Sequence, residues 1–117
     1  MGEEKPLSID DVINACSRAK LSNNTLSFDS YGTSEVRFDT INFLDSKGYT
    51  LEDGEKIINS LKKEDLDKGP VDNKDPTRQK HKLWIFKKYY EGLKLYIKLL
   101  VYKNGRCVAV VSLHDDR

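Results

Sequence analysis

The feature that most constrains the fold is an alternating run near the C-terminal end of the chain. Apolar residues alternate there with lysine, tyrosine and one further leucine, in the order Lys94-Leu95-Tyr96-Ile97-Lys98-Leu99-Leu100-Val101-Tyr102. A period of two is typical of a β-strand with one buried face. We therefore predict the middle strand of an antiparallel meander over residues 94–102. Its neighbours are expected over residues 82–90 and 107–114, after short Gly-containing connections.

Helical signals occupy the first half of the chain. Ser8 with Asp11, and Thr50 with Asp53, have the spacing of capping boxes, and Gly48 is placed to end a helix. Apolar residues at helical spacing follow or lie between these signals. The predicted helices span residues 8–20, residues 34–47 and a segment that starts after Thr50.

The remaining segments are expected to connect these elements. Residues 21–33 are polar and interrupted, residues 62–68 resemble a short helical turn, and Gly69-Pro70 begins a loop that continues to about Gln79. Helices followed by a meander indicate an α+β fold, with three N-terminal helices packed on a three-stranded antiparallel C-terminal sheet. A chain of 117 residues has the size of one domain. We expect a single domain over 1–117, with residues 1–33 forming an N-terminal helix and connector, and 34–117 the remainder.

Several protein classes are disfavoured by composition and motifs. No apolar run approaches the roughly 20 residues of a membrane span, and the first residues lack the apolar stretch of a secretory signal, so we expect a cytoplasmic protein without a membrane partner. Cys16 and Cys107 lie in a predicted helix and strand without a CxxC pair, which favours buried free thiols over a zinc site. Phosphate-binding glycine loops, HExxH and nucleophile-elbow motifs are absent, so no cofactor is expected.

Charge is distributed unevenly along the chain. Residues 1–60 contain 6 Lys/Arg and 11 Asp/Glu, a balance of −5, whereas residues 61–106 contain 13 and 6, a balance of +7. Segregated positive charge favours a polyanionic partner such as RNA, although a solvated lysine-rich surface would have the same composition.

The chemistry of these basic segments suits RNA cleavage without a metal. Such cleavage requires a base for the ribose 2′-hydroxyl, a cation for the phosphorane and an acid for the 5′-oxygen. Histidine, tyrosine and lysine can supply these roles. The candidate catalytic residues are His114, Tyr96, Lys98 and Lys68, and the candidate RNA-backbone contacts are Arg78, Lys80, Lys82, Lys87 and Lys88. His81 is expected at the surface, and Trp84 and Phe86 in the core or at its rim.

The order of residues in the C-terminal two-thirds resembles the MqsR family of messenger-RNA interferase toxins. The matching segments lie within residues 38–114, and the region 34–117 is accordingly interpreted as MqsR-like. They are Ile41-Asn42-Phe43-Leu44-Asp45-Ser46-Lys47-Gly48-Tyr49-Thr50, Ile57-Ile58-Asn59-Ser60-Leu61, Glu64-Asp65-Leu66-Asp67-Lys68-Gly69-Pro70 with Asp72, Leu83-Trp84-Ile85-Phe86, Leu95-Tyr96-Ile97-Lys98-Leu99 and Val111-Ser112-Leu113-His114.

The resemblance implies a RelE-like fold, metal-independent cleavage of messenger RNA at short sequences, and inhibition by a cognate antitoxin protein. Lys68 and Tyr96 match functional positions of the family. The chain departs from the best-known members at two positions. Ile85 stands where those members have glutamine, and His114 stands where they have lysine.

Strand parity decides whether His114 can act together with Tyr96. If Asn104-Gly105 forms a two-residue turn, Tyr96 pairs with Leu113 and His114 falls on the helix-covered face. If the loop has three residues, His114 shares the face of Tyr96 and Lys98. The enzyme hypothesis needs the second register. The alternative hypothesis is a non-catalytic RNA- or protein-binding module that uses the same basic face.

Overall fold

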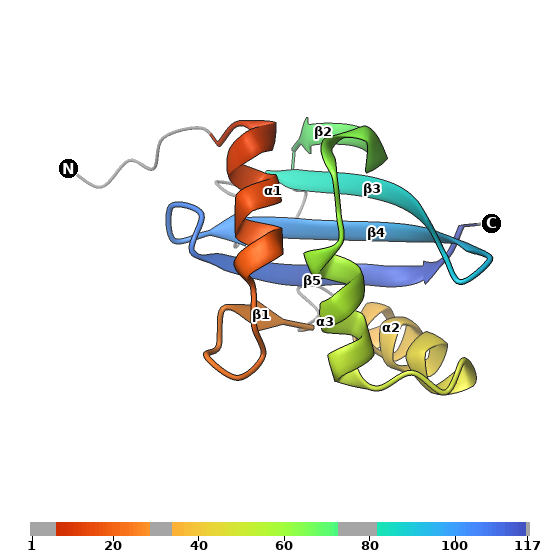
Figure 1. The fold of residues 1–117 in the computed structure, drawn as a ribbon. Helices are drawn as coiled ribbons and strands as arrows, with labels where there is room; N and C mark the ends of the chain where they lie inside the picture. Colours follow the sequence, from red (N-terminus) through yellow and green to blue (C-terminus); the bar gives the residue numbers. More distant parts are fainter. Residues whose placement is uncertain (1–6, 29–33, 73–81, 117) are drawn as a thin grey trace.

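The residues that the structure describes form one central sheet of five strands. The computed structural model describes residues 7–28, 34–72 and 82–116. The strands lie in the order β1-β5-β4-β3-β2, with β1 parallel to β5 and the other pairs antiparallel (Figure 1). Their bounds are β1 Leu26–Ser27, β2 Leu66–Val71, β3 Leu83–Tyr90, β4 Leu93–Tyr102 and β5 Cys107–Asp115. The last three confirm the predicted meander. The prediction of a RelE-like fold with a three-stranded antiparallel sheet is wrong, because two further strands, β1 and β2, extend the meander into a mixed sheet.

Strand β1 was not predicted because it is too short to show a period. Leu26 and Ser27 pair with Val108 and Ala109 of β5, and the Val108 N–H donates to the Thr25 carbonyl over 2.8 Å. Two residues cannot show alternation, and only the tertiary contact with β5 makes them a strand.

Strand β2 occupies residues that the sequence suggested were a helical turn and a loop. A single 3₁₀ turn, η1 Lys63–Asp65, does form, and the chain then extends along β3. A Gly-Pro pair is unusual inside a strand, but β2 lies at the sheet edge, where a missing N–H is tolerated. Gly69 also passes close to Trp84, since a Cβ at this position would lie 3.0 Å from the indole.

Two of the three α-helices in the described ranges cover one face of the sheet. Helices α1 Ile9–Arg18 and α3 Leu51–Asn59 both begin with the predicted capping boxes. They follow one another across the same face of the sheet, and their C-terminal ends meet (Figure 1). The side chain of Asn59 joins them, donating from Nδ2 to the carbonyls of Cys16 at 2.8 Å and Ala19 at 3.0 Å. These carbonyls lie at the C-terminal end of α1, where the last carbonyl groups of a helix have no N–H partner within the helix.

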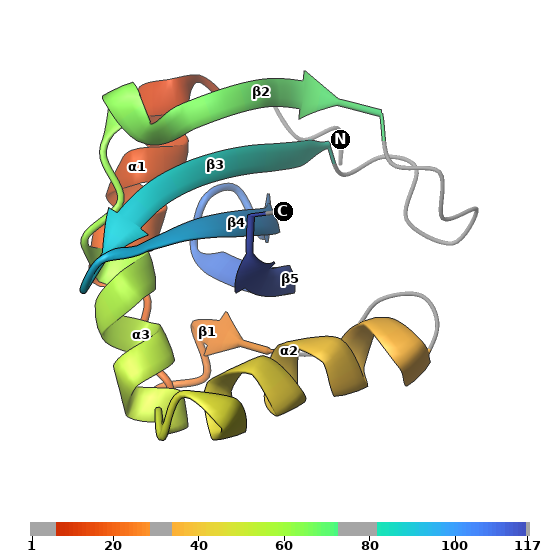
Figure 2. The same ribbon diagram turned by 90° about the vertical axis from the view of Figure 1, so that its right-hand side faces the viewer.

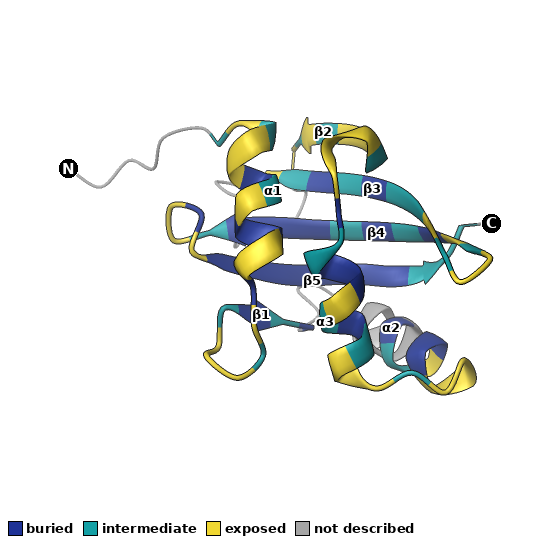
Figure 3. Cartoon of the chain, in the orientation of Figure 1, coloured by how far each residue is buried: buried dark blue, intermediate teal, exposed yellow. Residues whose placement is uncertain are grey.

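The core lies between this helical layer and the sheet (Figure 3). Trp84 and Phe86 point into it, as predicted, and both are buried. Both cysteines are free and buried, also as predicted, and burial raises the pKa of the Cys16 thiol to about 12. A smaller cluster of Leu100, Ala109 and Val111 lies on the opposite side of the sheet. We call the side turned away from α1 and α3 the far face.

Helix α2 Ser34–Ser46 takes a different position, along the β5 side of the sheet (Figure 2). Strand β1 pairs only with Val108 and Ala109, so further along this edge the N–H groups of β5 have no neighbouring strand in the described part of the chain. The buried Thr40 hydroxyl accepts the N–H of Leu113 over 3.2 Å. A helical side chain therefore replaces a strand partner at this point.

We expect Thr40→Val to lower the free energy of unfolding by about 1–3 kcal/mol, because the buried Leu113 N–H would lose its acceptor without a change of side-chain size. Urea unfolding followed by circular dichroism measures the loss. Thr40→Ser keeps the hydroxyl and is the matched control. A Thr40→Val protein as stable as wild type would show that this hydrogen bond contributes nothing.

Candidate functional site

A β-bulge in β5 sets which side chains share the far face. Near the hairpin, Tyr102 pairs with Cys107, and the same register continues to Leu99 and Val110. The next pair is Lys98 with Ser112, so Val111 is an extra residue on β5. Beyond this bulge, every β5 side chain lies on the face opposite to the one that the hairpin register alone would give it.

The bulge resolves the alternatives left open by the sequence. The hairpin loop, residues 103–106, has positive φ at Lys103, Asn104 and Gly105, and its register is the one expected for a two-residue turn. That register alone would have paired Tyr96 with Leu113. Because the bulge adds one residue, Tyr96 pairs with His114 instead, and both lie on the far face. The shared face therefore comes from the strand and not from the loop.

Tyr96 and His114 form a stacked pair at the centre of the site. Their ring centroids are 5.0 Å apart and their planes differ by 10°. His114 Nδ1 lies 2.7 Å from the backbone carbonyl oxygen of Asp115. A carbonyl can only accept, so Nδ1 carries the proton and the neutral ring has its lone pair at Nε2. An imidazole held in this form is able to take a proton from a substrate.

The tyrosine is held in its protonated form. Burial raises the pKa of Tyr96, an effect that nearby Lys87 opposes, and that the carboxylates of Asp67 and Asp116 reinforce. A phenol whose pKa lies above its ordinary value of about 10 is neutral throughout the physiological range. Tyr96 can therefore donate a hydrogen bond to an anionic ligand beside His114.

The predicted lysines Lys68 and Lys98 lie in one row across the sheet. Lys68 of β2 pairs with Ile85 of β3, Ile85 with Lys98 of β4, and Lys98 with Ser112 of β5. Lys98 is half-buried and Lys68 is exposed. Within the described ranges neither lysine forms an ion pair, so both ammonium groups are available to an anion.

A second row contains Tyr96, His114 and Lys87. Lys87 of β3 pairs directly with Tyr96, and its ammonium lies 3.6 Å from Asp116 and 4.0 Å from Asp67. Asp116 also lies 3.6 Å from Lys94. The site therefore contains carboxylates among its lysines.

The sequence did not indicate several members of this group. Lys94 and the exposed Tyr89 share the far face and pair with each other, with the ammonium 6.0 Å from the ring centroid. The parity of Lys94 with Tyr96 was a usable signal for it. Asp67 and Asp116 had no such signal in the sequence, because they approach Lys87 from segments that are far apart along the chain.

The other predicted RNA contacts are not gathered at this site. Lys88 pairs with core residue Leu95, so strand parity turns it toward the helical side, where it meets Asp65 at 3.6 Å. Lys82 is exposed just before β3 and forms an ion pair with Asp72. The remaining predicted contacts, Arg78 and Lys80, lie outside the described part of the chain, as does His81, which was predicted only to be at the surface.

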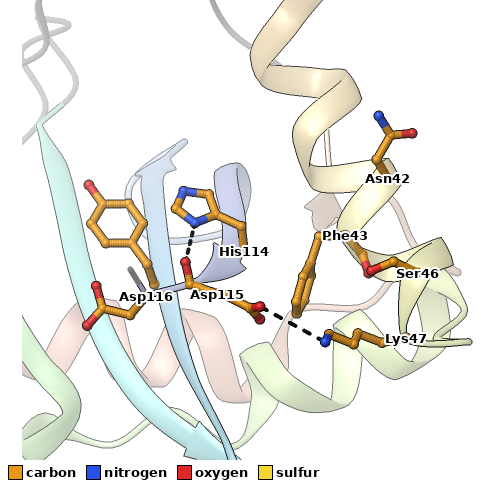
Figure 4. A pocket seen from close by; sticks show the side chains of 8 residues that line it. Asn42, Phe43, Ser46, Lys47, His114, Asp115 and Asp116 are labelled. Carbon is orange, nitrogen blue, oxygen red and sulfur yellow. Dashed lines mark hydrogen bonds and ion pairs between the residues drawn. The ribbon is translucent and has the colours of Figure 1, made fainter.

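A pocket of about 600 Å³ opens beside the stacked pair, between α2 and the ends of β4 and β5 (Figure 4). This volume is in the range of small-molecule sites. Its lining combines an apolar ring, an amide, hydroxyl groups and charged groups of both signs. The lining residues are Asn42, Phe43, Ser46, Lys47, Tyr96, His114, Asp115 and Asp116. The α2 contribution was not predicted, because it depends on how the helix packs along β5.

Comparison of the chain with protein-family models, with curated proteins and with solved structures gives no significant match. Among the residues that the structure describes, no three His, Cys, Asp or Glu side chains are grouped so that they could hold a metal ion. No helix in the described ranges is both long and apolar enough to cross a bilayer.

Proposed function

We propose that this chain is a metal-independent endoribonuclease that cleaves messenger RNA in the cytoplasm, as the toxin of a toxin–antitoxin pair. The observation that carries the proposal is the stacked Tyr96–His114 pair, with His114 Nδ1 on the Asp115 carbonyl and Nε2 left as the basic atom. The resemblance of residues 38–114 to MqsR toxins supports the same function. It is also the sole basis for proposing an antitoxin partner.

The proposed reaction is attack by the ribose 2′-oxygen on the adjacent phosphorus. His114 Nε2 takes the proton of the 2′-hydroxyl, the O2′–P bond forms, and the bond from phosphorus to the 5′-oxygen breaks. The departing 5′-oxygen receives a proton from the imidazolium. The products are a 2′,3′-cyclic phosphate and a 5′-hydroxyl, so no external oxidant, reductant or water is consumed.

The other residues act on the phosphate. Tyr96, as a neutral phenol, donates a hydrogen bond to a non-bridging oxygen, and Lys98 and Lys68 supply positive charge as the phosphorane develops. Lys98 lies two residues along β4 from Tyr96, and Lys68 lies in the same row as Lys98, two strands away on β2. Neither lysine has a carboxylate partner among the described residues. Lys87 and Lys94 are placed to follow the RNA backbone when phosphates replace Asp116 as their anionic neighbour.

The test is incubation of the folded, purified protein with end-labelled single-stranded RNA, with and without EDTA. We expect cleavage at equal rates in both conditions, with 2′,3′-cyclic phosphate and 5′-hydroxyl ends on the products. Expression of the protein in growing cells should arrest growth. The conservative variant Glu52→Gln on α3, away from the site, is the matched control and should cleave like wild type.

Three results would contradict the proposal. RNA that remains intact both in free form and on translating ribosomes would rule out the enzyme. Cleavage abolished by EDTA would show a metal requirement. Products with 3′-hydroxyl and 5′-phosphate ends would show attack by water rather than by the 2′-oxygen.

A further inference from the structure

The pocket beside His114 contains a second set of polar groups that the proposed cleavage does not use. These groups, Lys47 and Asp115, lie at the wall formed by α2 and the end of β5, next to the ring of Phe43 (Figure 4). Because Tyr96 and His114 line the same pocket, a molecule in it would lie beside the stacked pair.

Lys47 and Asp115 are close, but too far apart to satisfy each other. Lys47 Nζ lies 4.0 Å from Asp115 Oδ2, whereas a charge-assisted hydrogen bond is about 2.7–2.9 Å long. Both side chains are partly exposed. Oδ1 of Asp115 is buried without a hydrogen-bond partner in the described part of the structure, so Oδ2, the oxygen nearest Lys47, is the acceptor that a ligand can reach. The pair therefore retains hydrogen-bonding capacity on both its donor and its acceptor side.

A donor beside an acceptor fits one class of nucleobase edge. Uracil and guanine present a keto oxygen next to an N–H on their Watson–Crick edges, which complements an ammonium next to a carboxylate. Cytosine and adenine present an amino group next to an unprotonated ring nitrogen, the opposite order. Sequence-specific proteins read unstacked RNA bases through these edges.

The other lining residues of the pocket also suit a nucleobase. Phe43 of α2 is buried and offers an apolar wall. The Ser46 hydroxyl donates to the Phe43 carbonyl over 2.8 Å, and its oxygen adds a polar group to the lining. The volume of about 600 Å³ leaves room for the ribose. We propose that this pocket is a nucleobase subsite in which Lys47 and Asp115 select the keto bases uracil and guanine; this inference rests on the proposed RNA cleavage.

The first test measures binding and does not depend on cleavage. Wild-type protein is titrated with UMP, GMP, CMP and AMP, and binding is followed by NMR shifts of the backbone amides of β5 and α2. We expect UMP and GMP to bind about tenfold more tightly than CMP and AMP. Asp115→Asn should reduce this ratio to about one, and it leaves His114 in place because the His114 partner is the backbone carbonyl of residue 115.

The second test exchanges the two charges. Lys47→Asp combined with Asp115→Lys puts an acceptor where the donor was, so the preference should shift toward cytosine and adenine, both in mononucleotide binding and in the bases next to the cleaved bond. Asp45→Asn, near the end of α2 and two residues before Lys47 but not lining the pocket, is the matched control and should keep the wild-type preference.

The two proposals fail in different ways. RNA cleaved with no preference between keto and amino bases, or four nucleotides bound equally, would overturn the subsite and leave the nuclease intact. Selective binding of UMP and GMP by a protein that never cleaves RNA would overturn the nuclease and support the subsite. A protein that neither cleaves RNA nor selects nucleotides would overturn both.

Discussion

Replacing His114 with alanine is expected to lower the rate of RNA cleavage by about 10²–10⁴-fold, the usual contribution of a general acid or base. His114 is the group whose free ring nitrogen faces the substrate in the proposed reaction, and its stacked partner Tyr96 cannot take its place. Tyr96 stays protonated because burial raises its pKa. The effect is measured as a single-turnover rate on a labelled RNA at saturating enzyme.

RNA binding should change little in the same variant, because the lysines of the far face remain and the ionic contacts supply most of the affinity. The other histidine in the chain provides the control, since His81→Ala should cleave like wild type. Cleavage that survives in folded His114→Ala would remove this residue from the mechanism. Binding without cleavage in the wild-type protein itself would favour the alternative of a binding module.

Deleting Val111 together with Ser112 is expected to cause the second large effect, on stability and activity together. The register of Leu99 with Val110 would continue along the shortened β5 and pair Lys98 with Leu113 and Ile97 with His114. The His114 imidazole would then enter the core, and the fully buried Leu113 would face the far side. Burial of an unpaired polar group and loss of a large apolar one should together cost several kcal/mol of the free energy of unfolding.

The single deletion of Val111 distinguishes the register from simple damage. It removes only the extra residue of the bulge, so Ser112 still meets Lys98 and His114 still meets Tyr96. We expect this single deletion to keep most of the stability and to cleave RNA, whereas the double deletion does neither. Urea unfolding and the cleavage assay measure both. If both variants are equally impaired, Val111 matters for its own side chain and not for the register.

The parts of the fold that could be predicted are those with a repeating or local signal. Strand β4 shows alternation interrupted only at Leu100, and the capping boxes at Ser8 and Thr50 mark helix starts that the structure confirms. The short β1 and the Gly-Pro segment of β2 carry no such signal. They become strands only because β5 and β3 offer edges to pair with, which a reading of one segment at a time cannot detect.

The candidate site also contains residues that the sequence could place and residues that it could not. Tyr96 and Lys98 share a face by period two, and the sequence was enough to place them together. The position of His114 depended on one extra residue, and Val111-Ser112 resembles any other strand segment. The α2 wall of the pocket was beyond prediction for a different reason. Helical periodicity identifies the buried side of α2 only in general terms, and does not indicate that Lys47 reaches the end of β5.

The two borders of the sheet have a consequence for behaviour at high concentration. On one border, β1 and α2 cover the outer edge of β5, and the Thr40 hydroxyl accepts the N–H of Leu113. On the other, β2 has two register irregularities and Pro70 has no N–H to give. An incoming strand from another molecule would meet a helix at one border and an interrupted ladder at the other. The sheet is therefore protected on both sides against edge-to-edge aggregation.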